Sequence, residues 1–548
     1  MNLLKILGLK SKLFYIFLVI LGLISSITNM GMLLLINMTL GGQPMPYLNE
    51  YKPLAFIGML LISYFTTRFF QNYVVGITNG ILFDLELSVV QKVRHANFES
   101  FEKLGVEKIY AAINDTRILS RVPEIFVSLI NSFVTVLCAM IYLFWVSPAG
   151  ATTILIVLVN LLLIYLARNE QIEKDLNIVR DLQNSYYRSL GELLLGFKQV
   201  RISNLRSENL YQKYILANRN QSRDLGVRTS RKYVVNQLVG TYSWYLLFGI
   251  ILFILPVILK LDIGAIVAFI TSVLFMMAPI SQLISFFPFQ TGCRIALQRI
   301  NNIYKELEVD AVQDIDVKQN ESIKNFESIR FQDISYQYQG ALESSFALDS
   351  LNLEIGKGEI IFIVGGNGSG KSTFINLLTG LCIPSKGKVF VDNQELDWKG
   401  YGSFSNNMAV VYTNQHLFRE NYDNHNFSEE NSKLHHFRDM FNLNGIFRID
   451  PQRNNINTNV SKGEQKRLSL LLSMLEDKPI IILDEWAAEQ DPRNRRFFYT
   501  QWLKEMVRLG KTIIAVSHDD DYYHIADRVI KFNYGKIVED RLQASEKI

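Results

Sequence analysis

The sequence predicts an all-α membrane domain of six helices, followed by an α/β domain. Six long apolar runs lie before residue 290 of the 548-residue chain, and the stretch after it is more polar. Hydrophobic residues make up 49% of the chain and charged residues only 20%, which is more apolar than a soluble protein of this length. After residue 326, strand-like and helical stretches alternate, which is typical of an α/β fold.

Each apolar run is long enough to cross a bilayer, which takes about 20 residues in a helix. The first run follows Lys5, Lys10 and Lys12, and we interpret it as a retained signal-anchor helix because it is too long for the apolar core of a signal peptide. We place the six spans at residues 13–38, 54–75, 122–146, 149–167, 238–259 and 263–287.

The connectors between the spans predict the topology. Those at 41–53, 147–148 and 260–262 are short, whereas those at 76–121 and 168–237 are long and rich in Arg and Lys. Because positive charge stays on the cytoplasmic side, both long connectors and both termini are expected in the cytoplasm. Their helical periodicity predicts that the spanning helices continue well beyond the bilayer.

Net charge and cysteine spacing exclude two classes of function. The formal charge of +4 has no accompanying basic and aromatic cluster, so we expect no nucleic-acid partner. Cys138, Cys293 and Cys382 have no CxxC or Cys/His spacing, so we expect neither a disulfide framework nor a structural zinc site.

Several polar residues lie within the predicted spans. They either line a cavity for a transported molecule or make hydrogen bonds between helices, and their spacing leaves both interpretations open. Arg68 is expected to extend toward the cytoplasmic end of the second span. The polar residues are Asn29, Asn131, Asn160, Ser243, Ser272 and Gln282.

A phosphate-binding loop is predicted in "IIFIVGGNGSGKSTFINLLTG". An apolar strand, 360–364, precedes GxxxxGK[ST], and a helix is expected from about Thr373. Glycines let the backbone turn its N–H groups toward phosphate oxygens; Lys371 can reach the β- and γ-phosphates, and Ser372 can bind Mg²⁺. ATP and Mg²⁺ are therefore expected, and the expected ATP-binding residues are Gly366, Asn367, Gly368, Ser369, Gly370, Lys371, Ser372 and Thr373.

Two further strands end in residues suited to phosphate chemistry. "PIIILDEW" ends in Asp484, which we expect to hold Mg²⁺ through water, and in Glu485, which we expect to polarise the attacking water. An apolar run that ends in two acids is common by itself, but downstream of a P-loop it indicates a site for Mg²⁺ and the attacking water. "KTIIAVSHDD" places His518 at a strand end as a γ-phosphate contact. The expected catalytic residues are Glu485, His518 and Lys371.

With these motifs the chain resembles an exporter-type ATP-binding cassette transporter, a type IV half-transporter. "VSKGEQKR" at 460–467 resembles the family signature LSGGQ and keeps Ser461 and Gly463. The resemblance implies a transmembrane domain at 1–305, a linker at 306–326 and an ATP-binding cassette at 327–548. One cassette per chain implies a homodimer whose two ATP sites each combine the P-loop of one chain with the signature of the other.

The resemblance also assigns individual positions. It implies that Tyr338 stacks on adenine, that Asp491 signals across the dimer, and that Glu464 faces away from the γ-phosphate. The family usually has a Mg²⁺-contacting glutamine before "LF"; in "VVYTNQHLF" Thr413 has that spacing and Gln415 comes two residues later, so either could serve. The expected metal-site residues are Ser372, Asp484 and Thr413. Short coupling helices are expected near 105–113 and 205–214.

Three stretches resemble one branch of the family: "LDEWAAEQDPRNRRFFY", "SHDDDYY" and "LGELLLGFKQVR". This branch includes exporters of syringomycin, of pyoverdine precursors and of microcin-type peptides, whereas most other families have Pro-Thr or Pro-Ser where Trp486 stands here. The resemblance implies ATP-driven export of a cyclic-peptide- or siderophore-like molecule across the bacterial inner membrane. The alternatives are a siderophore importer with an exporter fold, an exporter of lipids or other hydrophobic molecules, a membrane-tethered ATPase and an ATP-gated channel.

Overall fold

The structure, a computed structural model, describes residues 12–40, 51–308, 326–337, 347–396, 404–450 and 455–543. It divides into two units by internal contacts. The membrane unit comprises Met1–Leu87 and Ala111–Asn301, and the cassette unit comprises Ser88–Tyr110 and Asn302–Ile548. Most of the predicted linker lies outside the described residues, so the predicted domain limits stay a prediction.

Long helices form the membrane unit, and six segments among the described residues are long and apolar enough to cross a membrane. This confirms the predicted number of spans. Three helices have more than 40 residues, about twice what a bilayer requires, as the periodic connectors predict. The helices before the cassette are α2 Lys12–Leu40, α3 Lys52–Arg94, α4 Phe98–Leu104, α5 Val106–Ser120, α6 Val122–Val146, α7 Pro148–Leu195, α8 Phe197–Ile202, α9 Asn204–Asn209, η1 Leu210–Leu216, α10 Ala217–Gly249, η2 Ile250–Ile254, α11 Leu255–Leu259 and α12 Ile263–Glu308.

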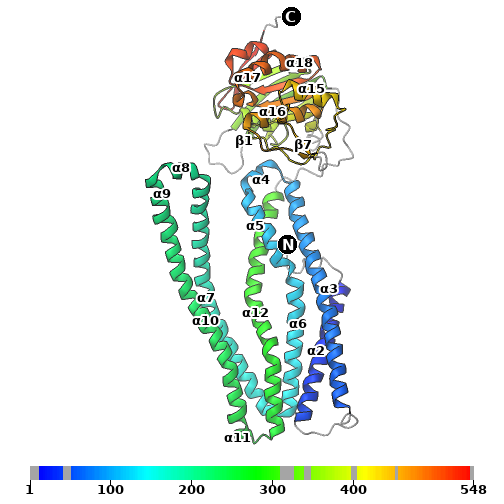
Figure 1. Ribbon diagram of the computed structural model, residues 1–548, viewed down its shortest axis with the longest axis vertical. Coiled ribbons are helices and arrows are strands. Elements are labelled where there is room, and N and C mark those ends of the chain that lie inside the picture. The colour runs from blue at the N-terminus through cyan, green and yellow to red at the C-terminus, as the bar shows by residue number, and fades with distance from the viewer. Residues whose placement is uncertain are drawn as a thin grey trace. The chain divides into compact units, whose positions relative to one another are not determined.

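Helices α7 and α10 form a long hairpin, and α8 and α9 make its tip (Figure 1). Lys232 of α10 lies 2.6 Å from the Asp175 carboxylate of α7, and the Arg219 guanidinium lies over the ring of Tyr186. The short helices at the tip begin earlier than the predicted 205–214, because Gly196 ends α7 and the Ser203 side chain caps α9.

Most of the polar residues in the spans bond to other helices or to their own backbone. Ser63 of α3 donates to Asn29 of α2 at 2.6 Å, and Ser128 and Ser132 of α6 both donate to Gln282 of α12 at 2.8 Å. For Asn29 and Gln282 the structure thus favours the packing interpretation. The side chains of Asn160 and Ser243 donate to carbonyls of their own helices, Ile156 O and Val239 O.

Glycine permits a close approach between α2 and α6. A Cβ at Gly22 would lie 1.9 Å from Asn131 Oδ1, so no larger residue fits without displacing that side chain. Small residues at such crossings let membrane helices pack at short distance.

Helix α4 belongs to the cassette unit and packs on its sheet. Asn97 caps α4 through its bond from Ser100 N, and Gly105, with φ of 76°, ends it. A short helix thus lies just before Gly105, and the predicted range 105–113 falls on the longer α5, so the position of the coupling helix stays a prediction. Tyr336 donates a hydrogen bond to the Glu99 carboxylate, and Phe98 packs against the buried core.

A six-stranded, mostly parallel sheet forms the centre of the cassette, in the order β12-β11-β3-β10-β9-β6. A four-stranded antiparallel sheet, β2-β1-β4-β5, lies beside it in the same unit. The strands are β1 Ser328–Gln337, β2 Ala347–Gly356, β3 Ile360–Val364, β4 Lys386–Val391, β5 Gln394–Glu395, β6 Met408–Val411, β7 Ile449–Asp450, β8 Asn455–Ile456, β9 Ile480–Asp484, β10 Thr512–Val516, β11 Arg528–Asn533 and β12 Lys536–Leu542.

Both faces of the central sheet are covered. Alternate residues of one strand enter different cores: Phe362 of β3 packs with α16 and α18 residues, whereas its neighbour Ile363 packs with α13 and the antiparallel sheet. Continuous apolar runs such as "IIFIV" are what a strand buried on both faces requires. The cassette helices are α13 Lys371–Leu378, α15 Ser432–Met440, α16 Lys462–Leu475, η4 Trp486–Glu489, α17 Pro492–Phe497, η5 Phe498–Trp502, α18 Leu503–Arg508 and η6 Asp520–Ile525.

Candidate nucleotide-binding site

Three neighbouring parallel strands bring the predicted phosphate-binding residues to one edge of the sheet. β10 pairs with β3 on one side and with β9 on the other, and Val516 lies opposite both Ile363 and Asp484. The P-loop follows β3, Glu485 follows β9, and Ser517 and His518 follow β10. Carboxyl ends of parallel strands are the usual place for ligands in open α/β sheets.

The P-loop folds tightly around the Lys371 ammonium. Lys371 Nζ donates to Gly365 O at 2.9 Å and to Gly366 O at 3.0 Å. Gly365 has a φ of +148°, and a Cβ there would lie 2.4 Å from Phe532 O, so only glycine fits. Ser369 Oγ is buried without a hydrogen-bond partner among the described residues, as expected for a group that binds phosphate.

The loop's lysine faces two carboxylates. Burial lowers the pKa of Lys371, and the nearby Glu485 and Asp484 carboxylates act in the opposite direction. Ser372 lies in the first turn of α13, where its hydroxyl is exposed, and Thr373 beside it is buried. The residues present thus fit a nucleotide phosphate chain, which binds at N–H groups and an ammonium, and its Mg²⁺, which prefers oxygen ligands.

Glu485 and His518 lie together at this edge. His518 Nε2 is 3.0 Å from Glu485 Oε1, which joins the predicted base to the predicted γ-phosphate contact. The residues on either side of His518 are held by Tyr499. The Tyr499 hydroxyl bonds to Ser517 Oγ at 2.7 Å and to the Asp519 carboxylate at 2.9 Å.

Thr413, rather than Gln415, reaches the carboxylate of Asp484, the predicted metal-site residue. Thr413 Oγ1 donates to Asp484 Oδ2 at 2.7 Å. The Gln415 side chain turns away and accepts from Tyr412 N at 3.1 Å. Gln415 contacts the signature helix instead, since its main-chain oxygen accepts from Gln465 at 2.6 Å. The structure thus favours Thr413 as the residue that orients Asp484.

The signature segment caps its own helix. The Ser461 side chain accepts from Glu464 N, and the Glu464 carboxylate accepts from Ser461 N at 2.7 Å, which together form a capping box. The bond from Ser461 N lowers the pKa of Glu464. Glu464 therefore folds back onto the start of α16. Gly463 O accepts from the Gln490 side chain at 3.1 Å, which links the signature to the segment after β9.

The structure describes Asp491 but not Tyr338, the two remaining residues of the predicted site. Asp491 caps α17 and accepts from Asn494 N at 2.9 Å, which lowers its pKa. Its role across a dimer stays a prediction. Tyr338, the predicted adenine-stacking residue, lies outside the described residues.

Lys466 and Trp486 lie inside the quoted motifs, but the sequence assigned neither of them a role in the site. Lys466 is 3% exposed, and its ammonium contacts the backbone of Glu485 at 2.8 Å. A sequence signal does exist: Lys466, Ser469, Leu470 and Ser473 follow the i, i+3, i+4, i+7 pattern of one buried helix face. A lysine on that face requires a partner inside the protein.

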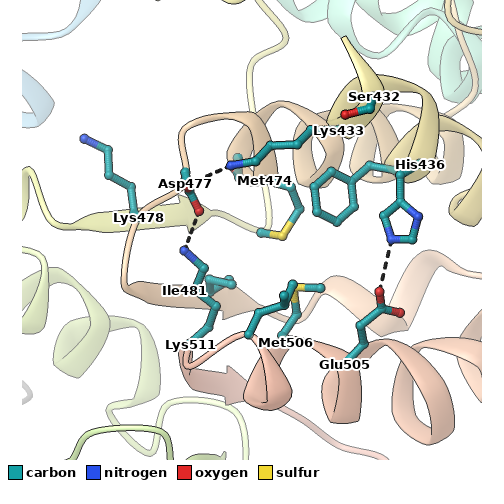
Figure 2. A pocket seen from close by; sticks show the side chains of 13 residues that line it. Ser432, Lys433, His436, Met474, Asp477, Lys478, Ile481, Glu505, Met506 and Lys511 are labelled. Carbon is teal, nitrogen blue, oxygen red and sulfur yellow. Dashed lines mark hydrogen bonds and ion pairs between the residues drawn. The ribbon is translucent and has the colours of Figure 1, made fainter.

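A cavity of about 530 Å³ lies at the opposite edge of the sheet (Figure 2). Lys478 and Lys511 precede β9 and β10, whereas the phosphate-binding residues follow these strands. Asp477 lies between Lys433 at 2.9 Å and Lys511 at 2.7 Å. Asp477 thus ties α15 to the segment before β10, and the cavity is separate from the predicted nucleotide site.

Comparison with known proteins places these motifs in a family. The ABC transporter family profile matches residues 348–488, which include the P-loop, the signature and Asp484-Glu485. The chain is 27% identical to the ATP-binding protein SyrD of Pseudomonas syringae pv. syringae over 95% of this chain and 93% of the relative. It is 24% identical to the ATP-dependent lipid A-core flippase of Burkholderia orbicola (strain AU 1054), over 89% and 83% of the two chains.

A solved structure shares the fold over the whole length. It is the structure of a bacterial Atm1-family ABC exporter with ATP bound, with a TM-score of 0.72 at 17% identity, covering 97% of this chain and 94% of that one. The chain therefore has an ABC exporter fold: six apolar helices followed by an α/β cassette. Its cassette is an ATP-hydrolysing ABC transporter domain, which uses ATP with Mg²⁺.

Replacing Thr413 with Val removes the hydroxyl that bonds to Asp484 and keeps the shape of the side chain. A hydrogen bond to a charged group contributes about 1.5 kcal/mol, so we expect the Mg²⁺ concentration for half-maximal ATPase activity to rise about tenfold. A Mg²⁺ titration of the purified full-length protein measures it. Gln415→Ala is the matched control and should leave the Mg²⁺ dependence unchanged; the reverse result would assign the role to Gln415.

Proposed function

We propose that the protein is a homodimeric half-transporter that uses ATP to export a cyclic-peptide- or siderophore-like molecule across the bacterial inner membrane. The observation that carries the substrate class is "LDEWAAEQD", in which Trp486 stands where most of the family has proline. The similarity to SyrD over nearly the full length of both chains supports the same branch. The positively charged connectors and the lysines before the first span support a cytoplasmic cassette.

The exposed tip of the α7–α10 hairpin supports a homodimer. Leu195, Ile202 and Leu205 are 91%, 86% and 74% exposed in the single chain. Apolar side chains gathered at the end of a long hairpin are unfavourable in water and typical of an interaction site. In the proposed dimer this tip lies against the cassette of the second copy.

The phosphate-binding edge supports a hydrolytic cycle. Lys371 would bind the phosphates, and Asp484, Ser372 and Thr413 would hold Mg²⁺, whose charge stabilises the transferred phosphoryl group. Glu485 would orient and polarise the attacking water, with His518 holding its carboxylate. In the family arrangement, Ser461 and Gly463 of the second copy would complete the site.

A polar groove between α2 and α3 is the candidate contact for the substrate. It encloses about 560 Å³, and Arg68, Tyr64, Gln71 and Asn72 line it from one face of α3. Arg68 is the only charged residue between Lys52 and Asp84. An arginine within a span normally faces a polar cavity or an anion, so the groove suits a substrate with polar or acidic groups.

The similarity to lipid A-core flippases favours a second candidate, the export of a lipid. ATP-dependent uptake into inside-out vesicles separates the candidates, with a fluorescent cyclic lipopeptide, a siderophore and a lipid A analogue as cargo. We expect the peptide or the siderophore to accumulate. Accumulation of lipid A alone would establish the flippase, and ATP-dependent loss of a preloaded siderophore would establish import.

Replacing Glu485 with Gln removes the carboxylate that polarises water and keeps the side-chain size. We expect ATP turnover to fall at least about 100-fold, because general-base catalysis contributes on this order. Binding of a fluorescent ATP analogue should be retained. Steady-state ATPase assays and fluorescence titration on the same preparation measure both. Turnover at the wild-type rate would remove Glu485 from the mechanism.

Replacing Leu195 with Asp places a carboxylate on the hairpin tip. If the tip is buried against a second copy, an unpaired buried carboxylate weakens that contact, and we expect ATPase activity to fall at least about fivefold. Tyr534→Asp is the control, because Tyr534 is 85% exposed at the turn between β11 and β12. Full activity of Leu195→Asp would mean that the tip stays in water during the cycle.

A further inference from the structure

Two hydrogen bonds run in opposite directions between the signature helix and the residues after β9. Lys466 Nζ donates to the main-chain oxygen of Glu485 at 2.8 Å. Trp486 Nε1 donates to the main-chain oxygen of Lys466 at 2.9 Å. Because each segment both donates and accepts, the pair fixes the distance between them and their rotation.

Both side chains are held by their surroundings. Trp486 is 2% exposed and stacks on Phe498 with ring centroids 4.5 Å apart. The Lys466 ammonium lies 3.7 Å from the Glu489 carboxylate. Burial lowers the pKa of Lys466, and the Glu489 carboxylate is the largest influence in the opposite direction. The ammonium is thus kept in place by an acid at its side as well as by the Glu485 carbonyl.

The backbone of Glu485 needs such support. Glu485 has φ of 51° and ψ of 38°, a left-handed conformation that is uncommon for a residue with a side chain. Such a conformation costs free energy, so it is kept only where surrounding contacts enforce it, often at functional sites. The Glu485 carboxylate bonds to His518. Its main-chain oxygen accepts a short bond from Lys466 at 2.8 Å and a longer one from Ala488 N at 3.4 Å, so the Lys466 bond is the stronger constraint on the peptide plane.

We propose that Lys466 and Trp486 form a clamp that positions Glu485 for attack by water and ties it to the signature helix of the same chain. Lys466 is a positioning residue, because it contacts the backbone of Glu485 and not the reacting atoms. Trp486 completes the clamp by holding the backbone of Lys466.

The clamp has a consequence for the two ATP sites, and this step rests on the proposed homodimer. Ser461 caps the start of α16, and in the dimer it would face the nucleotide bound by the second copy. Glu485 would serve the nucleotide bound by its own chain. When the signature of one copy binds the nucleotide of the second copy, the clamp would therefore set the position of Glu485 at the first copy's own nucleotide.

Single substitutions test the positioning role. Lys466→Met keeps a long unbranched side chain without the ammonium, and Trp486→Phe keeps a stacked ring without the indole N–H. The matched control is Trp502→Phe: Trp502 belongs to the same aromatic stack and is fully buried, but its Nε1 has no hydrogen-bond partner among the described residues.

We expect kcat for ATP hydrolysis to fall about tenfold in Lys466→Met and about threefold in Trp486→Phe, with KM for ATP within about twofold of wild type. The double variant should be no slower than Lys466→Met, because both act on one backbone segment. Trp502→Phe should keep kcat. The unfolding temperature of Lys466→Met should stay within about 5 °C of wild type, because the Glu489 side chain that loses its partner is 37% exposed and water can solvate it.

Mixed dimers test which site the clamp serves. Two differently tagged copies are co-expressed, and Glu485→Gln on one copy leaves a single working Glu485. Lys466→Met on the copy with the intact Glu485 should lower activity about tenfold. On the other copy, which supplies the signature to the working site, it should leave activity unchanged.

Each contrary result overturns the proposal. Equal loss from both mixed dimers would mean that Lys466 acts through the signature contact, and a raised KM with unchanged kcat would mean that it acts in nucleotide binding. A fall in kcat that tracks a large fall in unfolding temperature would make the clamp purely structural. Failure of the proposed homodimer is distinguishable, because the two differently tagged copies would then not purify together.

Discussion

The chemistry of the cassette depends on the parallel register of three buried strands. β3, β9 and β10 have five residues each, all of them buried, and their pairing leaves no freedom to slide. Ile361 and Ile363 pack on one side of the sheet, and Phe362 packs on the other. A slip of one residue would exchange the two cores and move Asp484 away from the P-loop. The positions of the phosphate-binding groups are thus a consequence of apolar packing.

A second constraint acts on the residues after β9. Asp484 is still part of the strand, but Glu485 leaves it in a left-handed conformation, so the strand alone does not determine where its carboxylate points. Helix α16 restrains this segment through two hydrogen bonds: Lys466 donates to Glu485 O, and Gln490 donates to Gly463 O. Trp486 belongs to the same set of contacts, because it donates to Lys466 O. Its stacking on Phe498 connects these contacts to η5.

The sequence predicts local features well and contacts between distant segments poorly. The strand 360–364 and the six spans were predictable, because apolar length and the P-loop glycines determine them within one short segment. The sequence does not delimit α4, because its signals, the Asn97 cap and Gly105 at its end, are weak ones. The sequence does not show that Lys466 is buried, because its burial follows from how α16 packs on β6 and η4. The choice between Thr413 and Gln415 likewise depended on which side chain faces Asp484.

The connector between α3 and α5 packs against the core that also holds the helix after the P-loop. Helix α4 belongs to the cassette unit, and Phe98 packs on the core that contains Tyr336 and Cys382. Burial there raises the pKa of the Cys382 thiol to about 11, as expected in a dry contact. The same core includes Phe374 of α13, the helix that follows the P-loop. Because close-packed interiors transmit strain, a displacement of α4 would strain the packing around α13. The chain between α3 and α5 is therefore connected, through the side chains of this core, to the helix that begins with Lys371.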